Sequence, residues 1–196
     1  MITPVQLQAK RLFDFSLALL LLPIIVVPLA VFLVGAALDV GHFGWFQQLR
    51  VGQHGNLFYM YKIRTLKPGH HRMGFLDNDA SFYGRFLRRF KLDELPQLFN
   101  VLFGHMSFVG PRPDVPGFAD VLAGADRIIL KVKPGVTGPA TLKYKNEEQL
   151  LAMQSDPETY NRTIIWTDKV EINKKYVQNW TFYLDLKYIL QSILLK

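Results

Sequence analysis

The chain has 196 residues, with 23 Lys and Arg against 16 Asp and Glu, a formal charge of +7 and no cysteine. The lack of cysteine excludes disulfides, thiolate metal sites and cysteine nucleophiles. The positive charge favours an anionic partner, whether a phosphorylated substrate, acidic lipid headgroups or nucleic acid. The length predicts one domain with an appendage.

The appendage is an uncharged segment near the N-terminus. Between Asp14 and Asp39 lie 24 residues without a charged side chain. As a helix this segment is long enough to cross a hydrocarbon core about 30 Å thick. Pro23 and Pro28 interrupt the helix, because each lacks an amide hydrogen and clashes with the carbonyl group four residues earlier.

Three interpretations of this segment are open. A signal peptide would have Lys10 and Arg11 ahead of its apolar core, but that core would exceed the usual ~7–15 residues. A straight transmembrane helix would keep Lys10 and Arg11 in the cytoplasm and place the basic remainder outside. A helix that bends at the prolines and returns would keep both basic flanks on one face, provided that protein or water satisfies the freed backbone groups. The residues alone leave the last two equally open.

Residues 47–65 predict a β-hairpin, because β-forming side chains alternate on both sides of the turn GQHGN. Residues 81–90 predict a helix with phenylalanines on one side and arginines on another. The residues concerned are Phe82, Phe86, Phe90, Arg85, Arg88 and Arg89. Such a helix suits an anionic membrane surface, and it equally suits an amphipathic helix whose Phe face lies in the core.

Asp93 and Glu94 are adjacent in the stretch KLDELPQLFN. Adjacent carboxylates raise each other's pKa unless a cation offsets them. The apolar spacing that follows predicts a helix with Asp93 as N-cap, Pro96 in the first turn and Gly104 as the stop. Capping by itself would explain the acidic pair, because carboxylates suit the positive end of a helix dipole.

A second use of the pair is chemical. An ionised carboxylate can bind Mg²⁺ through oxygen or attack phosphorus. Arg88 and Lys91 could hold phosphate charge beside it. This combination would serve phosphoryl transfer, in which positioning and charge neutralisation do most of the catalysis. The residues permit this chemistry without requiring it.

Residues 105–117, HMSFVGPRPDVPG, predict a rigid loop because they contain three prolines and two glycines. Arg112 lies between Pro111 and Pro113, so its direction is well fixed. The loop is either a phosphate clamp or simply stiff. Residues 156–179 predict a long helix capped by Asp156, and an amphipathic helix is expected to end the chain.

The block LDELPQLFNVLFGHMSFVGPRP, residues 92–113, closely resembles the signature of bacterial sugar transferases. More narrowly, it resembles the small, monotopic polyprenol-phosphate phosphoglycosyl transferases. The resemblance covers nearly the whole chain in order, through KRLFD (10–14), YKIRTL (61–66), KPGVTG (133–138) and YVQNWTFYLDLKYI (176–189).

The resemblance implies an α+β, helix-dominated fold with a small β-hairpin. Residues 1–40 would form a re-entrant membrane helix-break-helix, with the break at Pro23 and Pro28. Residues 41–196 would form a catalytic domain with interfacial amphipathic helices. The protein would be monotopic in the bacterial inner membrane, in contact with the lipid bilayer and facing the cytoplasm, which selects the same-side course of the hydrophobic segment.

The resemblance also implies a two-step reaction. Asp93 would attack the β-phosphorus of a UDP-sugar, release UMP and form an aspartyl phosphosugar, which polyprenol (undecaprenyl) phosphate then accepts as polyprenol-diphosphate-sugar. This is the first membrane step of polysaccharide assembly, as in capsule, exopolysaccharide or O-antigen, or of glycoconjugate assembly. Downstream glycosyltransferases are possible partners.

The same resemblance assigns the site residues. Glu94 and Asp93 would hold Mg²⁺, with Mn²⁺ possible, and Arg88 would steady the substrate phosphate. The remaining expected substrate-binding residues are Arg112, Pro111, Pro113, Lys62 and Arg64.

Three features depart from the family pattern. Leu22-Pro23 replaces a Ser-Pro pair, His105 replaces an aspartate, and PATLKYKNEE (139–148) replaces a segment with a Gln and a Gly-Arg pair. They leave an alternative, a non-catalytic membrane-anchored relative that binds polyprenol phosphate or partner glycosyltransferases. A nucleic-acid partner rests only on the basic charge and the arginines, so none is expected.

Overall fold

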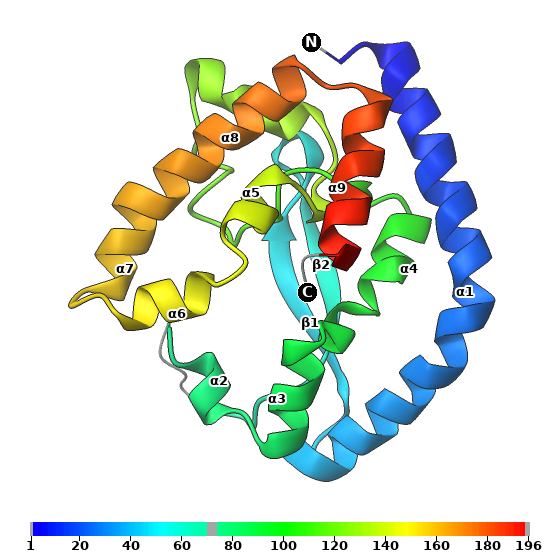
Figure 1. Cartoon of the computed structure of the whole chain (residues 1–196), viewed down its shortest axis with the longest axis vertical. Helices are drawn as coiled ribbons and strands as arrows, with labels where there is room; N and C mark the ends of the chain where they lie inside the picture. The colour runs from blue at the N-terminus through cyan, green and yellow to red at the C-terminus, as the bar shows by residue number, and fades with distance from the viewer. Residues whose placement is uncertain (1, 70–73, 195–196) are drawn as a thin grey trace.

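The computed structural model describes residues 2–69 and 74–194. In this part of the chain helices dominate, and two small two-stranded sheets lie among them (Figure 1). The helices and helical turns are α1 (Pro4–Val40), η1 (Gln53–Gly55), α2 (Leu76–Asp79), α3 (Phe82–Arg89), η2 (Leu92–Glu94), α4 (Gln97–Leu102), η3 (Gly124–Lys131), α5 (Pro139–Lys143), α6 (Glu147–Ala152), α7 (Pro157–Tyr160), η4 (Asn161–Ile165), α8 (Trp166–Gln178) and α9 (Phe182–Leu194). The strands are β1 (Trp45–Val51), β2 (Leu57–Ile63), β3 (Ser107–Val109) and β4 (Gly135–Thr137). The predicted helix-dominated fold with a small hairpin is confirmed.

Helix α1 is uninterrupted although it contains Pro23 and Pro28. Thr3 and Gln6 form a capping box at its start, and Gly41 ends it with a φ of 68°. The helix axis bends in its second half (Figure 1), as expected where prolines remove helical hydrogen bonds. The predicted break at the prolines is therefore a bend within one helix. This helix is long and apolar enough to cross a membrane, and only 11% of its most apolar window is buried in the protein.

Both ends of α1 are fastened to the rest of the chain. Near its start, Lys10 forms a buried ion pair with Asp185 of α9. The Arg11 guanidinium donates to the last carbonyl groups of α4 at 2.6 and 2.8 Å. At the other end, the hydroxyl of Ser81, which caps α3, donates to Asp39. The re-entrant course of the helix and the division of the chain at residue 40 stay predictions.

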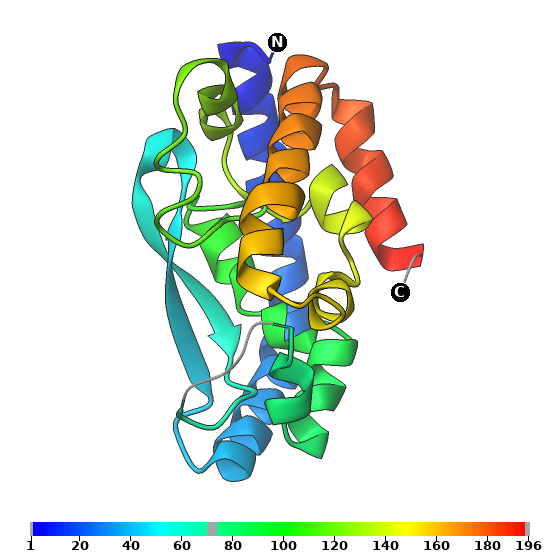
Figure 2. The same cartoon turned by 90° about the vertical axis from the view of Figure 1, so that its left-hand side faces the viewer.

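Strands β1 and β2 form the antiparallel hairpin predicted for residues 47–65, with Gln47 opposite Tyr61. The hairpin lies along one side of the molecule, opposite α9 (Figure 2). Its turn places His54 at a φ of 61° and Gly55 at 87°, which is why this sequence can reverse there.

Asn100 joins α4 to the edge of the hairpin. Its Nδ2 donates to the Tyr59 carbonyl oxygen at 2.8 Å, and its Oδ1 accepts from the Tyr61 amide at 2.9 Å. The side chain is fully buried. One side-chain amide thus pairs with a backbone donor and a backbone acceptor on the free edge of β2, which would otherwise be left unpaired.

Part of the segment predicted as a rigid loop is a strand. β3 pairs in parallel with β4, with Ser107 opposite Gly135. A Cβ on Gly135 would lie 2.1 Å from the Gly110 amide nitrogen, so the two backbones approach as closely as only glycine allows. Three-residue strands carry too little alternation to be predicted.

The phenylalanine side of α3 is not in the core. Phe82 is 83% exposed, and Phe86 and Phe90 are also exposed. The core side is formed by Gly84 and Leu87. The core alternative for these phenylalanines is therefore wrong, while their use at a membrane surface stays a prediction.

The C-terminal helices follow the prediction closely. Asp156 accepts a hydrogen bond from the Thr159 amide at 3.1 Å and caps α7. The helical run continues through the π-turn η4 into α8. Helix α9 then lies beside the first half of α1 (Figure 1), where the rings of Phe13 and Phe182 meet edge to face at 5.0 Å.

We expect Asn100→Ala to lower the free energy of unfolding by about 2–3 kcal/mol, because it leaves a donor and an acceptor of β2 unpaired. Chemical denaturation in detergent measures this. Asn179→Ala is the matched control: Asn179 is exposed and donates only to the Lys175 carbonyl group, so the loss should stay below about 0.5 kcal/mol. Equal losses in the two variants would show that Asn100 does not hold α4 on the hairpin.

Candidate active site

The acidic pair lies on a short turn rather than at the cap of α4. Lys91 adopts a left-handed conformation, with a φ of 53°, and the 3₁₀ turn η2 follows it. The N-cap position of α4 is Pro96, which makes no side-chain capping bond. The predicted N-cap role of Asp93 is therefore wrong, because the helix begins one turn later than its apolar spacing indicates. Gly104, at a φ of 83°, stops the helix as predicted.

Glu94 is held by two cations on one oxygen. Its Oε1 accepts from Arg112 Nη2 at 2.7 Å and from Lys62 Nζ at 3.1 Å. Its side chain is only 12% exposed. Burial alone would raise the pKa of Glu94, but the charges of Arg112 and Lys62 outweigh it and hold that pKa well below its usual range. Glu94 is thus a fixed anion.

Asp93 lies in a different environment. It is 6% exposed. Burial raises its pKa, and the charge of Glu94 adds to this effect, whereas Lys62, Arg88 and Arg112 oppose it. Two neighbouring carboxylates with pKa values pushed in opposite directions mark a site with divided chemical roles. Asp93 is therefore the more basic member of the pair.

The other predicted site residues fall into two groups. Lys62 of β2, Arg112 and Arg88 meet around the acidic pair. Arg64 is not brought to it by its described contacts: its Nε donates to the Phe43 carbonyl oxygen at 3.2 Å, and its guanidinium lies 5.1 Å from the centre of the Phe46 ring. It fastens the connection between α1 and β1.

Pro111 and Pro113 contribute through their backbones. The Pro111 carbonyl oxygen accepts from the Gly135 amide at 2.8 Å. The Pro113 carbonyl oxygen accepts from Arg50 Nη1 at 3.0 Å. Because both prolines have a fixed φ, these bonds hold Arg112 between them in one orientation.

The residues fit a metal ion that arrives with a phosphorylated ligand. Among the described residues no cluster of three or more His, Cys, Asp or Glu could form a complete metal site. Mg²⁺ is commonly held by one or two carboxylates together with substrate phosphates. Asp93 and Glu94 supply two such carboxylates. Oε1 of Glu94 also contacts the side chains of Lys62 and Arg112.

Sequence reasoning missed a second charged group behind Arg112. Burial and the charge of Arg112 together lower the pKa of Arg50 to about 10, against the opposing charges of Asp114 and Glu94. Desolvation of half-buried Asp114 raises its pKa to about 6, against the opposing charges of Lys169 and Arg50. Lys169 also contacts Glu147 at 2.7 Å. Isolated charges in a strand and a loop carry no pattern that would have found them.

An apolar groove of about 590 Å³ lies between α1, the hairpin and α4. Its walls are mostly aliphatic and aromatic side chains. They are Val26, Leu29, Ala30, Leu33, Phe43, Trp45, Gln47, Tyr61, Phe99 and Phe103. Tyr61 immediately precedes Lys62 in β2, so the groove and the acidic pair share a strand. The groove is of the size that holds small ligands in other proteins.

The positions that depart from the family pattern lie in packing surfaces. His105 is exposed, and its ring stacks on Phe58 at 5.9 Å. Leu22 packs against the core cluster that includes Phe58. In the 139–148 segment, the Tyr144 hydroxyl donates to Asp168 of α8 at 2.7 Å. None of these contacts involves Asp93.

Comparison with known proteins identifies the family of the chain. The family model described as "Bacterial sugar transferase" matches residues 5–195. The chain belongs to this family. It is 35% identical to "Uncharacterized sugar transferase EpsL" of Bacillus subtilis (strain 168), over 94% of this chain and 85% of that protein.

Two other relatives have more specific names. One is "Undecaprenyl-phosphate galactose phosphotransferase" of Salmonella typhimurium, 30% identical over 93% of this chain. The other is "UDP-glucose:undecaprenyl-phosphate glucose-1-phosphate transferase" of Klebsiella pneumoniae, 32% identical over 76% of this chain. The matches span only 39% and 31% of the length of these two proteins.

Asp114 predicts a pH dependence of stability. Burial raises the pKa of Asp114 from its ordinary value of 3.8 to about 6, so the folded state binds this proton more tightly. The contribution to stability is present below about pH 4 and is lost as the pH rises to about 6. We expect Asp114→Asn to remove this loss. The unfolding midpoint of the variant, relative to that of the wild type, should therefore rise between pH 4 and pH 6.5.

Asp168→Asn is the control for this measurement. Hydrogen bonds from Lys143 and Tyr144 lower the pKa of Asp168, so its shift is opposite in direction to that of Asp114. Its difference from the wild type should stay constant above about pH 4. A constant difference for Asp114→Asn over the same range would contradict the raised pKa.

Proposed function

We propose that the protein transfers a phosphosugar from a UDP-sugar to a polyprenol phosphate such as undecaprenyl phosphate, and so begins polysaccharide or glycoconjugate assembly. The observation that carries the proposal is the asymmetric pair, with Glu94 fixed by Lys62 and Arg112 and Asp93 left buried and basic. Family membership and the names of the Salmonella and Klebsiella relatives support it.

In the first half-reaction a carboxylate oxygen of Asp93 forms a bond to the β-phosphorus of the donor. The bond from that phosphorus to the bridging oxygen breaks, and UMP leaves with the electron pair. The raised pKa of Asp93 strengthens the nucleophile. Arg88, one turn before Asp93, would hold the phosphate oxygens in line.

Mg²⁺, or Mn²⁺ in its place, would be held by Asp93, Glu94 and the donor diphosphate, and would supply neutralisation of the phosphate charge. Glu94 keeps its charge because Arg112 and Lys62 hold it ionised. The same two cations would attract the diphosphate.

In the second half-reaction a phosphate oxygen of the polyprenol phosphate attacks the phosphorus bound to Asp93. The bond between that phosphorus and the Asp93 oxygen breaks, which restores the carboxylate and gives polyprenol-diphosphate-sugar. Because Asp93 is only 6% exposed, little water reaches it, and this protects the acyl phosphate from hydrolysis.

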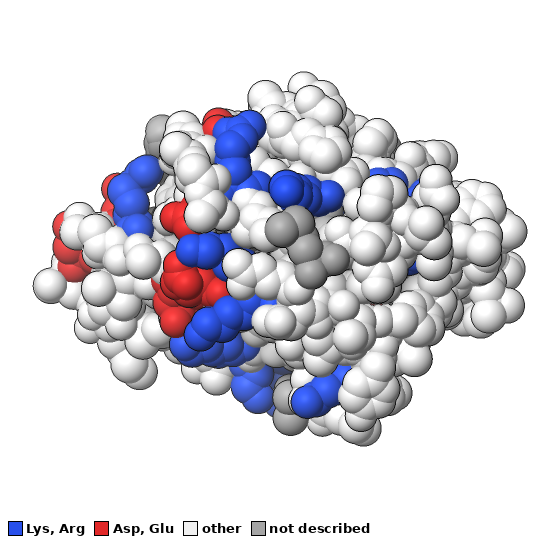
Figure 3. Space-filling view, turned by 90° about the horizontal axis from the view of Figure 1, so that it is seen from above, with Lys and Arg blue, Asp and Glu red and all other residues white. Residues whose placement is uncertain are grey.

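The placement of α1 supports a monotopic protein at the cytoplasmic face of the inner membrane. Lys10 and Asp39, near opposite ends of this helix, both bind the same folded body. A helix that spans the bilayer straight would carry its two ends to opposite faces, whereas a bent helix returns to one. Figure 3 shows charged side chains gathered on the side away from α1, while the part over α1 is almost uncharged.

The apolar groove provides a place for the polyprenyl chain. Phe99 of α4 lines it, and η2, which carries the acidic pair, immediately precedes α4. A hydrocarbon chain in the groove would gain about 25 cal/mol for each Å² of apolar surface removed from water. The acceptor phosphate would then approach from the lipid side and the donor from the charged side.

We expect the purified protein in nanodiscs, with Mg²⁺ and undecaprenyl phosphate, to release UMP from one member of a panel of UDP-sugars. Asp93→Asn should lower the rate by at least about a thousand-fold, because it removes the nucleophile. EDTA should also stop the reaction. Asp168→Asn, at a half-buried carboxylate outside the site that pairs with Lys143, is the matched control and should retain the wild-type rate. A folded wild-type protein that releases no UMP from any donor would refute the proposed function.

Ala30→Trp tests the groove. The indole would fill the space that Ala30 lines, so KM for undecaprenyl phosphate should rise about tenfold, equivalent to about 1.4 kcal/mol. KM for an acceptor with a short isoprenoid chain should change little. Val31→Trp is the control, because Val31 is 63% exposed and lies outside the groove. Equal effects on the long and short acceptors would place the chain elsewhere.

A further inference from the structure

Four buried polar side chains meet beside β3, away from the acidic pair. They are Lys10 and Asp14 of α1, Tyr176 of α8 and Asp185 of α9, and none is more than 4% exposed. They belong to the segments KRLFD (10–14) and YVQNWTFYLDLKYI (176–189), to which the reaction described above gives no role.

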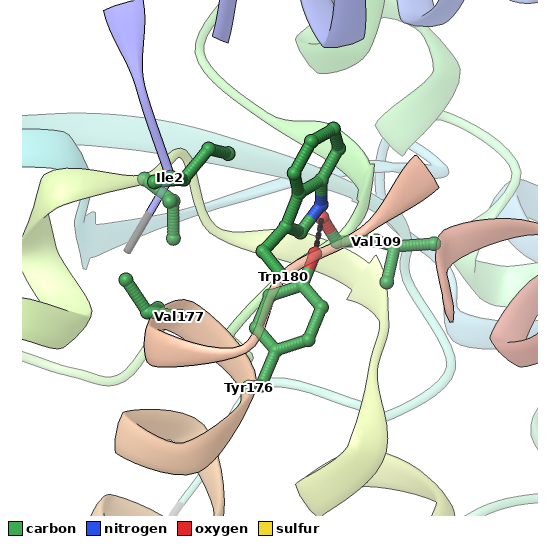
Figure 4. Close-up of a cluster of buried hydrophobic side chains, with 6 residues drawn as sticks. Ile2, Val109, Tyr176, Val177 and Trp180 are labelled. Atoms are coloured by element: carbon green, nitrogen blue, oxygen red, sulfur yellow. Dashed lines mark hydrogen bonds between the residues drawn. The ribbon is translucent and has the colours of Figure 1, made fainter. Parts of the chain in front are cut away.

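Their hydrogen bonds hold strand β3 at two consecutive residues, and the first contact is made by Tyr176. Lys10 is paired with Asp185 Oδ2, and the Tyr176 hydroxyl donates to Asp185 Oδ1 at 2.7 Å. The same hydroxyl lies 3.4 Å from the Val109 carbonyl oxygen. Figure 4 shows it directed at the Val109 backbone, with the Trp180 indole alongside.

The second contact with β3 is made by a residue of α1. Asp14 Oδ1 accepts from the Phe108 amide at 3.1 Å. Phe108 and Val109 are consecutive in β3, so the two contacts hold the strand from different helices. β3 is therefore held by side chains of α1 and α8 as well as by its pairing with β4, and Asp185 of α9 holds the Tyr176 hydroxyl.

The strand leads directly to Arg112. Gly110 donates to the Thr137 carbonyl oxygen at 2.9 Å, and Pro111 and Pro113 fix the backbone on either side of Arg112. A displacement of β3 is therefore carried to the guanidinium, which lies 2.7 Å from Glu94 Oε1. A bond of this kind weakens within a few tenths of an ångström.

We propose that Lys10, Asp14, Tyr176 and Asp185 are positioning residues that set Arg112 against Glu94. This inference rests on the proposed function. A buried ion pair adds little to stability over well-packed apolar side chains, so stability alone does not explain it. It does fix a single geometry, because both oxygens of Asp185 are used. Through Lys10 and Asp14, the position of helix α1 would therefore affect the position of Arg112.

Tyr176→Phe is the mildest test, because it removes one hydroxyl and keeps the ring. We expect the rate of UMP release to fall roughly ten- to a hundred-fold, as a misplaced catalytic group does. Asp185→Asn, which keeps a polar partner for Tyr176 but loses the charge, should behave in the same way. Tyr144→Phe is the matched control: it breaks a Tyr–Asp hydrogen bond of the same length, 2.7 Å, to Asp168 of α8 rather than beside β3, and should leave the rate unchanged.

Two readouts separate positioning from folding. In an Arg112→Lys background, Tyr176→Phe should reduce the rate less than twofold further, because its effect acts through Arg112. Hydrogen–deuterium exchange of residues 107–113 should rise in Tyr176→Phe and not in Tyr144→Phe. Full activity in Tyr176→Phe and Asp185→Asn, or an undiminished effect in the Arg112→Lys background, would overturn the proposal. So would unchanged exchange. A wild-type protein that releases no UMP would refute the proposed function instead, and the exchange measurement would still test the contacts with β3.

Discussion

One oxygen atom of Glu94 holds the site together. It accepts hydrogen bonds from Lys62 and Arg112, which lie 32 and 18 residues away in the chain. Without these cations a carboxyl group so deeply buried would take up a proton. With them Glu94 stays ionised, and its charge helps to raise the pKa of Asp93 beside it. The different character of two adjacent carboxylates thus follows from which of them the cations contact.

The rest of the fold brings these three segments to one point. Asn100 fixes α4, and with it the turn that carries the acidic pair, on the edge of β2, where Lys62 lies. The close pairing of β3 and β4 fixes the strand that leads to Arg112. Helix α1 packs against a core cluster formed by side chains of β2, α4, β3 and β4. Its exposed apolar side lies opposite the charged surface (Figure 3). Under the proposed function, this arrangement would let a polar donor and a lipid acceptor approach the same phosphorus from different sides.

Local patterns in the sequence predicted the hairpin, the cap at Asp156 and the stop at Gly104, because each depends on a few neighbouring residues. The course of α1 and the N-cap role of Asp93 could not be read in this way. The first depends on how the helix packs, and the second on a left-handed Lys91 that no propensity favours. The exposed Phe side of α3 shows a further limit, since an amphipathic pattern does not say whether its apolar face meets a core or a membrane. Arg64 shows another: it lies one residue beyond β2 and turns to Phe43 instead of the site.

The segment 139–148 departs most from the family pattern, yet it is linked to the site by charge rather than by contact with Asp93. Glu147 pairs with Lys169, and its charge also helps to hold the proton on Arg112. Arg112 in turn has its largest interaction with Glu94. A change of charge at Glu147 would therefore alter the electrostatic surroundings of Arg112, while the contacts of Asp93 stay as they are. Under the proposed function, this segment would therefore act on the donor phosphates through Arg112 rather than by contact with the nucleophile.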